Sequence, residues 1–193
     1  EEGFFEPIIN KEKCIKCSLC FKRCPQLNDV KIEKKINISK AFAVKNKNLE
    51  EQKKSSSGGI FSVLARYVLK NNGVVYGAFN ENFKLEHIRI DKQESLYKLM
   101  GSKYLQSNTQ NTFELVKKDL NDGVNVLYVG TPCQIAGLRS YLGKDYEDLL
   151  LVDLVCHGVP SQKLFDKYLT WLKKKNNSSI IEYEFRSKEK NSW

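Results

Sequence analysis

At 193 residues with an apolar fraction of 41%, the chain is long enough to bury a hydrophobic core, and we expect one ordinary domain or two small ones. It has no run of about 18 apolar residues and no N-terminal signal pattern, so neither a membrane span nor a cleaved signal peptide is expected. The formal charge of +9 comes from lysines scattered along the chain, which does not indicate nucleic-acid binding. An anionic cofactor or an acidic electron-carrier protein accounts for such a charge equally well.

The N-terminal segment contains four of the six cysteines in one run, C-x2-C-x2-C-x3-C-P, made of Cys14, Cys17, Cys20, Cys24 and Pro25. Such short spacing lets thiolates wrap one corner of a cubane cluster, and the proline restrains φ after the last of them. We therefore expect Cys14, Cys17 and Cys20 to hold a [4Fe-4S] cluster. In two-cluster ferredoxins the fourth cysteine of such a run ligates the other cluster, so Cys24 is expected to serve a cluster completed elsewhere.

Two other interpretations of the cysteine run are a zinc site and a disulfide pair. Zinc sites usually pair two C-x2-C halves over a longer loop and lack the third cysteine and the C-P ending. Cysteine usage of this kind fits a reducing compartment, so a cytoplasmic location is expected. Residues 1–10 look like the linker after the first half of a two-cluster ferredoxin, and we interpret the N-terminus as cut inside such a module.

After the cysteine run, the first half of the chain alternates polar segments with short periodic ones. Residues 28–40 are lysine-rich and are expected to connect two units, and residues 46–54 are expected to form a surface loop. A helix is expected at 60–69, with Gly73 as its C′ residue, the position that commonly adopts the left-handed conformation. A second helix is expected at 94–100, and strands are expected at 41–44, 74–79 and 85–90.

The second half continues the alternation of helices and strands. The expected helices are 109–120, 134–142 and 161–175, and the expected strands are 124–129, 149–155 and 180–185. The near-continuous apolar run 149–155 is expected to be a buried strand of a parallel sheet. This alternation predicts an α/β fold, a mainly parallel sheet flanked by helices, preceded by a partial ferredoxin-like iron–sulfur segment. We divide the chain into residues 1–38 and 39–193.

Two short stretches are candidates for contact with an anionic ligand. Residues 55–59, Ser-Ser-Ser-Gly-Gly, offer hydroxyls and a helix N-terminus suited to a phosphate or diphosphate. A serine cap followed by turn glycines explains them equally well, and they lack the spacing of a P-loop or dinucleotide fingerprint. Lys103, between a glycine turn and Tyr104, is placed either to contact a phosphate or flavin ring or simply to be solvated.

Cys133 and Cys156 both follow predicted strands, and ligands of parallel sheets bind beyond such carboxyl ends. If the two strands are neighbours, both thiols lie at one edge of the sheet. Cys133 also begins a predicted helix, where a metal-binding thiolate is favoured, although a buried inert cysteine is the alternative. His87 is expected to be structural, and we discount a Cys156–His157 nucleophilic pair because sequence neighbours seldom point at each other.

Five motifs occur in a characteristic order: the run Cys14–Pro25, then Ser57-Gly58-Gly59, Gly101-Ser102-Lys103-Tyr104, Gly130-Thr131-Pro132-Cys133-Gln134 and Cys156-His157-Gly158-Val159-Pro160-Ser161. In this order they resemble the beta subunit family of coenzyme F-420 hydrogenases and dehydrogenases, whose relatives include formate dehydrogenase beta subunits. The resemblance covers residue 1 to about residue 190.

The resemblance implies an oxidoreductase, an iron–sulfur flavoprotein that passes electrons between [4Fe-4S] clusters and FAD and on to a deazaflavin-type or other organic acceptor. It also implies a redox partner protein, either a hydrogenase, a dehydrogenase or a ferredoxin. It assigns no catalytic residue. The residues implied for the flavin site are Ser57, Gly58, Gly59, Lys103 and Thr131, and Cys133 and Cys156 are implied close to it as further cluster ligands.

Two departures limit what the resemblance implies. The upstream ferredoxin half is missing, and the chain is expected to stop in the middle of the family's C-terminal region, so the fragment is not expected to be active alone. The alternative is a non-catalytic ferredoxin-like electron-relay module that serves a partner enzyme, for example in polysaccharide biosynthesis.

Overall fold

The computed structural model describes residues 2–27, 40–186 and 188, so the predicted connector and the division at 38/39 lie almost entirely outside the described residues. Its centre is a four-stranded sheet in the order β2-β1-β3-β4. The strands are β1 (Val74–Glu81), β2 (Lys84–Ile90), β3 (Val126–Gly130) and β4 (Leu149–Asp153). β1 pairs antiparallel with β2 and parallel with β3, and β3 pairs parallel with β4. The predicted α/β class with a mainly parallel sheet is confirmed.

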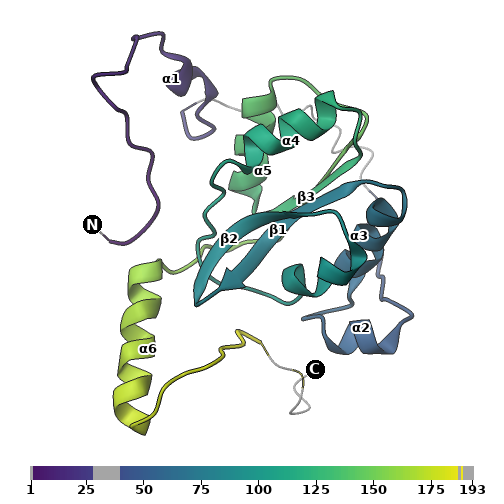
Figure 1. Ribbon diagram of the computed structural model, residues 1–193, viewed down its shortest axis with the longest axis vertical. Coiled ribbons are helices and arrows are strands. Elements are labelled where there is room, and N and C mark those ends of the chain that lie inside the picture. Colours follow the sequence, from purple (N-terminus) through teal and green to yellow (C-terminus); the bar gives the residue numbers. More distant parts are fainter. Residues whose placement is uncertain (1, 28–39, 187, 189–193) are drawn as a thin grey trace.

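Helices cover both faces of this sheet (Figure 1). On one face, α3 (Ile60–Lys70) and the 3-10 helix η2 (Gln93–Leu99) pack against Val75 and Leu127. On the other face, α4 (Thr112–Asn121) and α5 (Pro132–Leu142) pack against Tyr76 and Tyr128. Neighbouring residues of a strand thus enter opposite cores, as the two-residue period of a strand requires.

The remaining helices are α1 (Leu19–Arg23), α2 (Leu49–Lys53) and α6 (Gln162–Asn176). α6 buries Phe165 and Leu169 in a third cluster with Leu85 and Leu105. Within the described residues, no helix combines the length and the apolar character that a membrane crossing requires.

Two predicted strands are wrong. Residues 41–44 pair with no strand of the described sheet, and the Phe42 side chain is largely exposed there. Residues 180–185 also form no strand, because their aromatic side chains Tyr183 and Phe185 pack on Phe165 of α6 while their backbone pairs with no other strand. The aromatic and β-branched residues of these segments therefore predicted strands, but the backbones pair with no described strand.

Three other local predictions need correction. Residues 46–54 contain α2, capped by the Asn48 side chain, which accepts hydrogen bonds from the N–H groups of Glu50 and Glu51. β4 is only half-buried, because it lies at the edge of the sheet. After α3 it is Asn72, with φ of 58°, that adopts the left-handed conformation expected for Gly73.

Candidate functional site

The Ser-Gly stretch lies at the carboxyl end of the parallel strands. α3 leads into β1 through a short turn, so its N-terminus, with Gly58 and Gly59, lies at the end of the sheet where β1 finishes. Gly59 has φ of 76°, and a Cβ there would lie 3.2 Å from Ser55 Oγ. The carbonyl of Gly58 accepts from Asn46 N–H at 2.7 Å, and that of Gly59 accepts from Ser62 Oγ at 3.0 Å. Glycine and these hydrogen bonds together define the shape of the loop.

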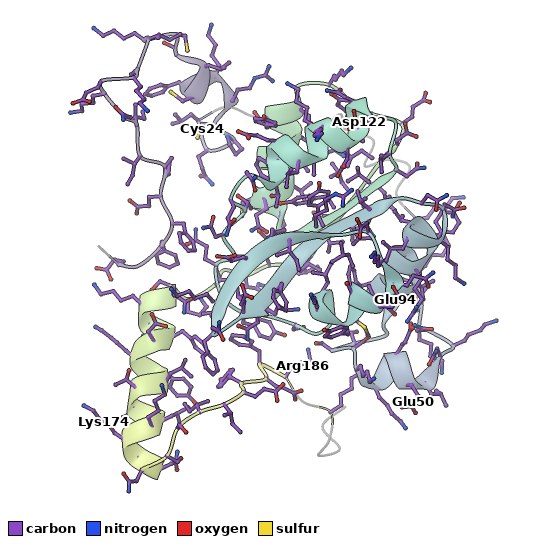
Figure 2. All side chains as sticks on the ribbon, viewed as in Figure 1. Cys24, Glu50, Glu94, Asp122, Lys174 and Arg186 are labelled. Carbon is purple, nitrogen blue, oxygen red and sulfur yellow. The ribbon has the colours of Figure 1, made fainter. Side chains whose placement is uncertain are left out.

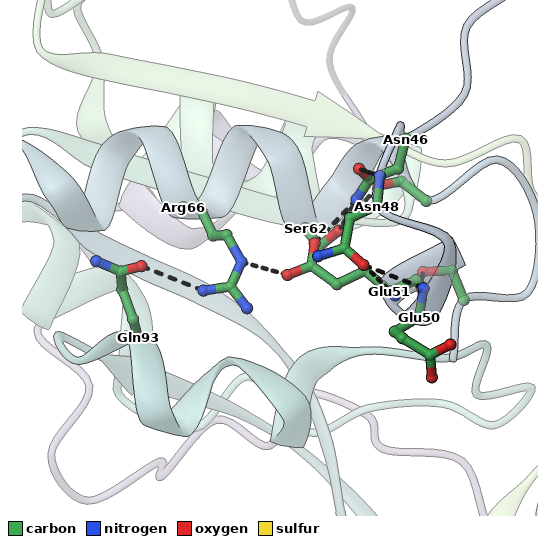
Figure 3. Close-up of polar contacts among 9 residues, drawn as sticks. Asn46, Asn48, Glu50, Glu51, Ser62, Arg66 and Gln93 are labelled. Carbon is green, nitrogen blue, oxygen red and sulfur yellow. Dashed lines mark hydrogen bonds and ion pairs between the residues drawn. The ribbon is translucent and has the colours of Figure 1, made fainter. Parts of the chain in front are cut away.

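A polar network joins this loop to α2, α3 and Gln93 (Figure 3). The buried Asn46 amide donates to Glu51 Oε2 at 2.9 Å and to Ser62 Oγ at 3.0 Å. Arg66 pairs with Glu51 and donates to Gln93 Oε1 at 3.2 Å. Burial acts to raise the pKa of Glu51, but hydrogen bonds from Ser62, Asn46 and Arg66 outweigh it and hold the pKa below its usual value. The charged sequence of residues 46–54 predicted a surface loop and gave no sign of this role for Asn46 and Glu51.

Lys103 and its turn meet the Ser-Gly stretch. Ser102 N–H donates to Ser56 Oγ at 2.7 Å, which joins segments 46 residues apart. Lys103 Nζ donates to the carbonyls of Met100 at 2.8 Å and Gly101 at 3.2 Å. Burial lowers the pKa of Lys103 to about 8. In the described part of the chain no carboxylate pairs with this ammonium, so its charge is available to an anionic ligand.

A second cation reaches the same loop from the C-terminal segment. Lys188 Nζ donates to the carbonyl of Ser57 at 2.9 Å and to that of Gln52 at 3.0 Å. In the same segment Arg186 hydrogen-bonds to Tyr104, and hydrogen bonds from Ser102 and Arg186 lower the pKa of Tyr104. Nothing in the local sequence around Lys188 signals this contact, because its partners lie more than 130 residues away.

The next motif follows β3 at the same end of the sheet. Thr131 precedes α5, and its N–H donates to Gln134 Oε1 at 3.0 Å, while its Oγ1 lies 3.1 Å from Cys133 Sγ. Gln134 Nε2 in turn donates to the carbonyl of Ser107 at 3.3 Å. Thr131 is therefore connected to the chain segment that follows Lys103.

His87 completes this connection from β2. Its Nε2 lies 3.1 Å from the carbonyl oxygen of Val129 and its Nδ1 lies 2.8 Å from Ser107 Oγ. Because a carbonyl only accepts, Nε2 carries the proton and Nδ1 accepts from the hydroxyl. Burial lowers the pKa of His87 to about 4; the hydrogen bond to Val129 opposes this shift and the charge of Lys103 adds to it. The buried position fits the structural role expected of His87.

Cys133 and Cys156 lie at one edge of the sheet, as the sequence predicted for neighbouring strands. β3 and β4 are adjacent and parallel, with Gly130 opposite Asp153, and each cysteine follows within three residues of its strand. Both thiols are exposed. Among the described residues no three Cys, His, Asp or Glu side chains converge as a metal site, so a ligand role for these two cysteines stays a prediction.

The N-terminal cysteines lie on another part of the molecule. Lys16 and Ser18 have φ of 56° and 59°, so the chain turns sharply between the cysteines, and α1 occupies most of the interval from Cys20 to Cys24. All six cysteines lie in the described residues and are thiols, with none in a disulfide. Cys24 lies near the α4 and α5 side of the sheet, away from Arg186 (Figure 2). Four cysteine thiols in a short, turning loop match the donor chemistry of an iron–sulfur cluster, although no three of them converge in the described residues.

Comparisons with known proteins match two stretches of the chain. Residues 7–27 match the model of the 4Fe-4S binding domain, and residues 123–193 match the model of the C terminus of the coenzyme F420 hydrogenase/dehydrogenase beta subunit. A ketoisovalerate oxidoreductase subunit VorD of Pyrococcus furiosus is 54% identical over 22 residues, which are 11% of this chain and 21% of that protein.

A solved structure of an F420-reducing [NiFe] hydrogenase complex from Methanosarcina barkeri has a similar fold. Its TM-score is 0.52 at 21% identity, and the match covers 70% of this chain and 49% of that chain. This chain thus spans about half of the solved relative and a fifth of the curated one. The family predicted from the order of the motifs is supported: residues 123–193 match the C terminus of the coenzyme F420 hydrogenase/dehydrogenase beta subunit, and residues 7–27 match the 4Fe-4S binding domain.

Proposed function

We propose that this chain is part of an iron–sulfur flavoprotein oxidoreductase. In this proposal Cys14, Cys17 and Cys20 hold a [4Fe-4S] cluster that exchanges electrons with FAD bound at the carboxyl end of the sheet. The FAD then exchanges electrons with a deazaflavin-type or other organic acceptor, and a redox partner protein exchanges them with the cluster. FAD suits this task because it handles both single electrons and hydrides.

The observation that supports a flavin site is the convergence of three separate motifs at one end of the sheet. The hydrogen bond from Ser102 N–H to Ser56 Oγ joins the Ser-Gly loop to the Lys103 turn. Gln134 joins the Thr131 motif to the same segment through the carbonyl of Ser107. Ligands of open α/β sheets bind at this end.

The charges around the loop favour an anionic ligand such as the FAD diphosphate. Lys103 has no carboxylate partner in the described residues, and the Lys188 ammonium donates a hydrogen bond to the carbonyl of Ser57. The N-terminus of the eleven-residue helix α3 adds the positive end of its dipole. In this proposal Ser57, Gly58 and Gly59 hold the diphosphate through hydroxyl and N–H groups, and Lys103 and Thr131 orient the rest of the cofactor.

Anaerobic reconstitution with iron, sulfide and FAD tests the proposal. We expect absorbance near 400 nm, as ferredoxin-type clusters give, and its loss in the triple variant Cys14→Ser, Cys17→Ser, Cys20→Ser. We expect Lys103→Met to weaken FAD binding about tenfold, because a charge-assisted hydrogen bond contributes on that order. Lys118→Met, on the exposed side of α4, is the control and should bind FAD normally. Equal FAD binding by both lysine variants would contradict the assignment of Lys103.

A second candidate function is a ferredoxin-like relay that passes electrons to a partner enzyme and catalyses nothing. The match of residues 7–27 to the 4Fe-4S binding domain is compatible with this function without any flavin. The same reconstitution distinguishes the two, because a chain that forms the cluster but binds no FAD would favour the relay.

A further inference from the structure

The cysteine segment and the α/β domain cap each other's helix ends. Arg23, the last residue of α1, donates from Nη1 to the carbonyl of Ser140 at 2.7 Å, and Ser140 Oγ donates back to the carbonyl of Arg23 at 2.6 Å. Both carbonyls belong to the last turn of a helix, where they have no partner within the helix. The guanidinium also lies at the negative end of the α5 dipole, where a cation is favoured.

The shape of α5 at this point suits the contact. Gly143 ends the helix with φ of 71°, and a Cβ there would lie 2.6 Å from Arg23 Nη1. The left-handed backbone therefore favours glycine here, and a larger residue would also displace the guanidinium from its present position.

A second contact holds the start of the same segment. Phe5 N–H donates to Gln106 Oε1 at 2.6 Å, and Gln106 Nε2 donates to the carbonyl of Phe5 at 3.1 Å. Gln106 precedes Ser107, which contacts both His87 and Gln134 at the candidate flavin site. One contact thus lies beside that site, and the other lies at the far end of α5.

We propose that Arg23 and Gln106 are positioning residues that dock the cluster-binding segment on the α/β domain and so set the path for electron transfer from the cluster to the flavin. The proposal rests on the proposed function for the identity of the two cofactors. The docking itself rests only on these two reciprocal pairs of hydrogen bonds. Between Phe5 and Arg23 the chain carries Cys14, Cys17 and Cys20, so both ends of the cluster loop are held.

α5 gives this arrangement a defined length. Cys133 lies in its first turn and Ser140 in its last, and seven residues of helix span about 10 Å at 1.5 Å per residue. A docked segment therefore holds the cluster loop beside α5, at a limited distance from the end of the sheet where α5 begins. A detached segment would sample longer separations and transfer electrons more slowly.

Hydrogen exchange on the full chain tests the docking without any cofactor. In Arg23→Met and Ser140→Ala we expect faster exchange in peptides covering residues 15–27 and 138–146. The ratio of docked to detached segment should fall about tenfold in Arg23→Met, since hydrogen bonds to charged groups contribute on that order. Lys22→Met, which alters the exposed neighbouring cation of α1, is the control and should exchange as the unsubstituted chain does.

Gln106→Ala tests the second contact independently, and it should speed exchange in residues 2–10 only. In reconstituted protein, Arg23→Met should slow flavin reduction by the prereduced cluster while iron and flavin contents stay unchanged. Unchanged exchange at residues 138–146 in both Arg23→Met and Ser140→Ala would overturn the docking. If the unsubstituted chain formed no cluster, the proposed function would fail while the exchange result still decided the docking.

Discussion

Lys103 and His87 show how strongly the surroundings of a single residue change its chemistry. Both lie near the carboxyl end of β3, and burial lowers the pKa of each, to about 8 for Lys103 and about 4 for His87. The result near neutral pH is an ammonium beside a neutral imidazole. His87 also stacks on Tyr128 with ring centroids 5.3 Å apart, so its ring belongs to the packed interior.

The pKa of His87 predicts a loss of stability in acid. Its pKa is about 4 in the folded chain and 6.5 without burial, so between these values the unfolded chain binds more protons. Stability should therefore fall as the pH drops from 6.5 to 4, by about 3 kcal/mol at most. Urea unfolding at several pH values measures this slope. His87→Gln should lose it, and His157→Gln should keep it; an unchanged slope in His87→Gln would contradict the prediction.

The pKa of Lys103 predicts a pH dependence of flavin binding. The ammonium attracts an anion only while it is protonated, so FAD affinity should decline as the pH rises through about 8. A bound diphosphate stabilises the charge and moves the transition upward in the complex. Equilibrium titration of FAD between neutral and alkaline pH measures the effect, and Lys103→Met should remove this transition while Lys118→Met retains it.

At the scale of elements, α2 and α3 are joined by a side-chain network rather than by an apolar seam. α2 buries none of its residues, yet Glu51 in it is only 13% exposed because Asn46, Ser62 and Arg66 surround its carboxylate. The network therefore stabilises the Ser-Gly loop, since Asn46 N–H also holds the carbonyl of Gly58.

Glu51→Gln should destabilise the chain by about 1 to 2 kcal/mol, because it removes the charge that Arg66 and its neighbours satisfy. Glu50→Gln is a matched control one residue away. Glu50 is 75% exposed, and its one ion pair within the described residues is with Lys53 at the surface, so its loss should cost less than about 0.5 kcal/mol. Chemical denaturation of both variants gives the comparison, and equal losses would show that the network contributes little.

For the molecule as a whole, we predict that the cluster-binding segment contributes little to the stability of the α/β core. The three hydrophobic clusters contain no residue from 2–27. The described contacts of that segment with the rest of the chain include the hydrogen bonds of Arg23 and Gln106 and the close approach of Gly3 to Lys163 of α6. Replacing Cys14, Cys17 and Cys20 by serine in cofactor-free chain should therefore shift the melting temperature of the core by no more than about 2 °C. Calorimetry checks this, and a larger shift would mean that the segment is part of the core.

Helices and strands were predictable where the apolar residues repeat with the period of a helix or a strand. The helix at 60–69 and the strands at 74–79 and 124–129 all appear, with small changes at their ends. The strands at 41–44 and 180–185 were wrong because strand formation needs a partner, which a short apolar segment does not specify. The predicted ligand roles of the cysteines and the flavin-site residues stay predictions.

The sequence by itself determined the iron–sulfur segment, the α/β class and the family, because ligand spacing, hydrophobic period and motif order are written along the chain. Only the tertiary structure decided which residues surround the candidate flavin site and how the cysteine segment is docked. Ser56 and Ser102 are 46 residues apart, Arg23 and Ser140 are 117 apart, and Ser57 and Lys188 are 131 apart. No local pattern encodes such pairs, since they form only when the fold brings distant segments together.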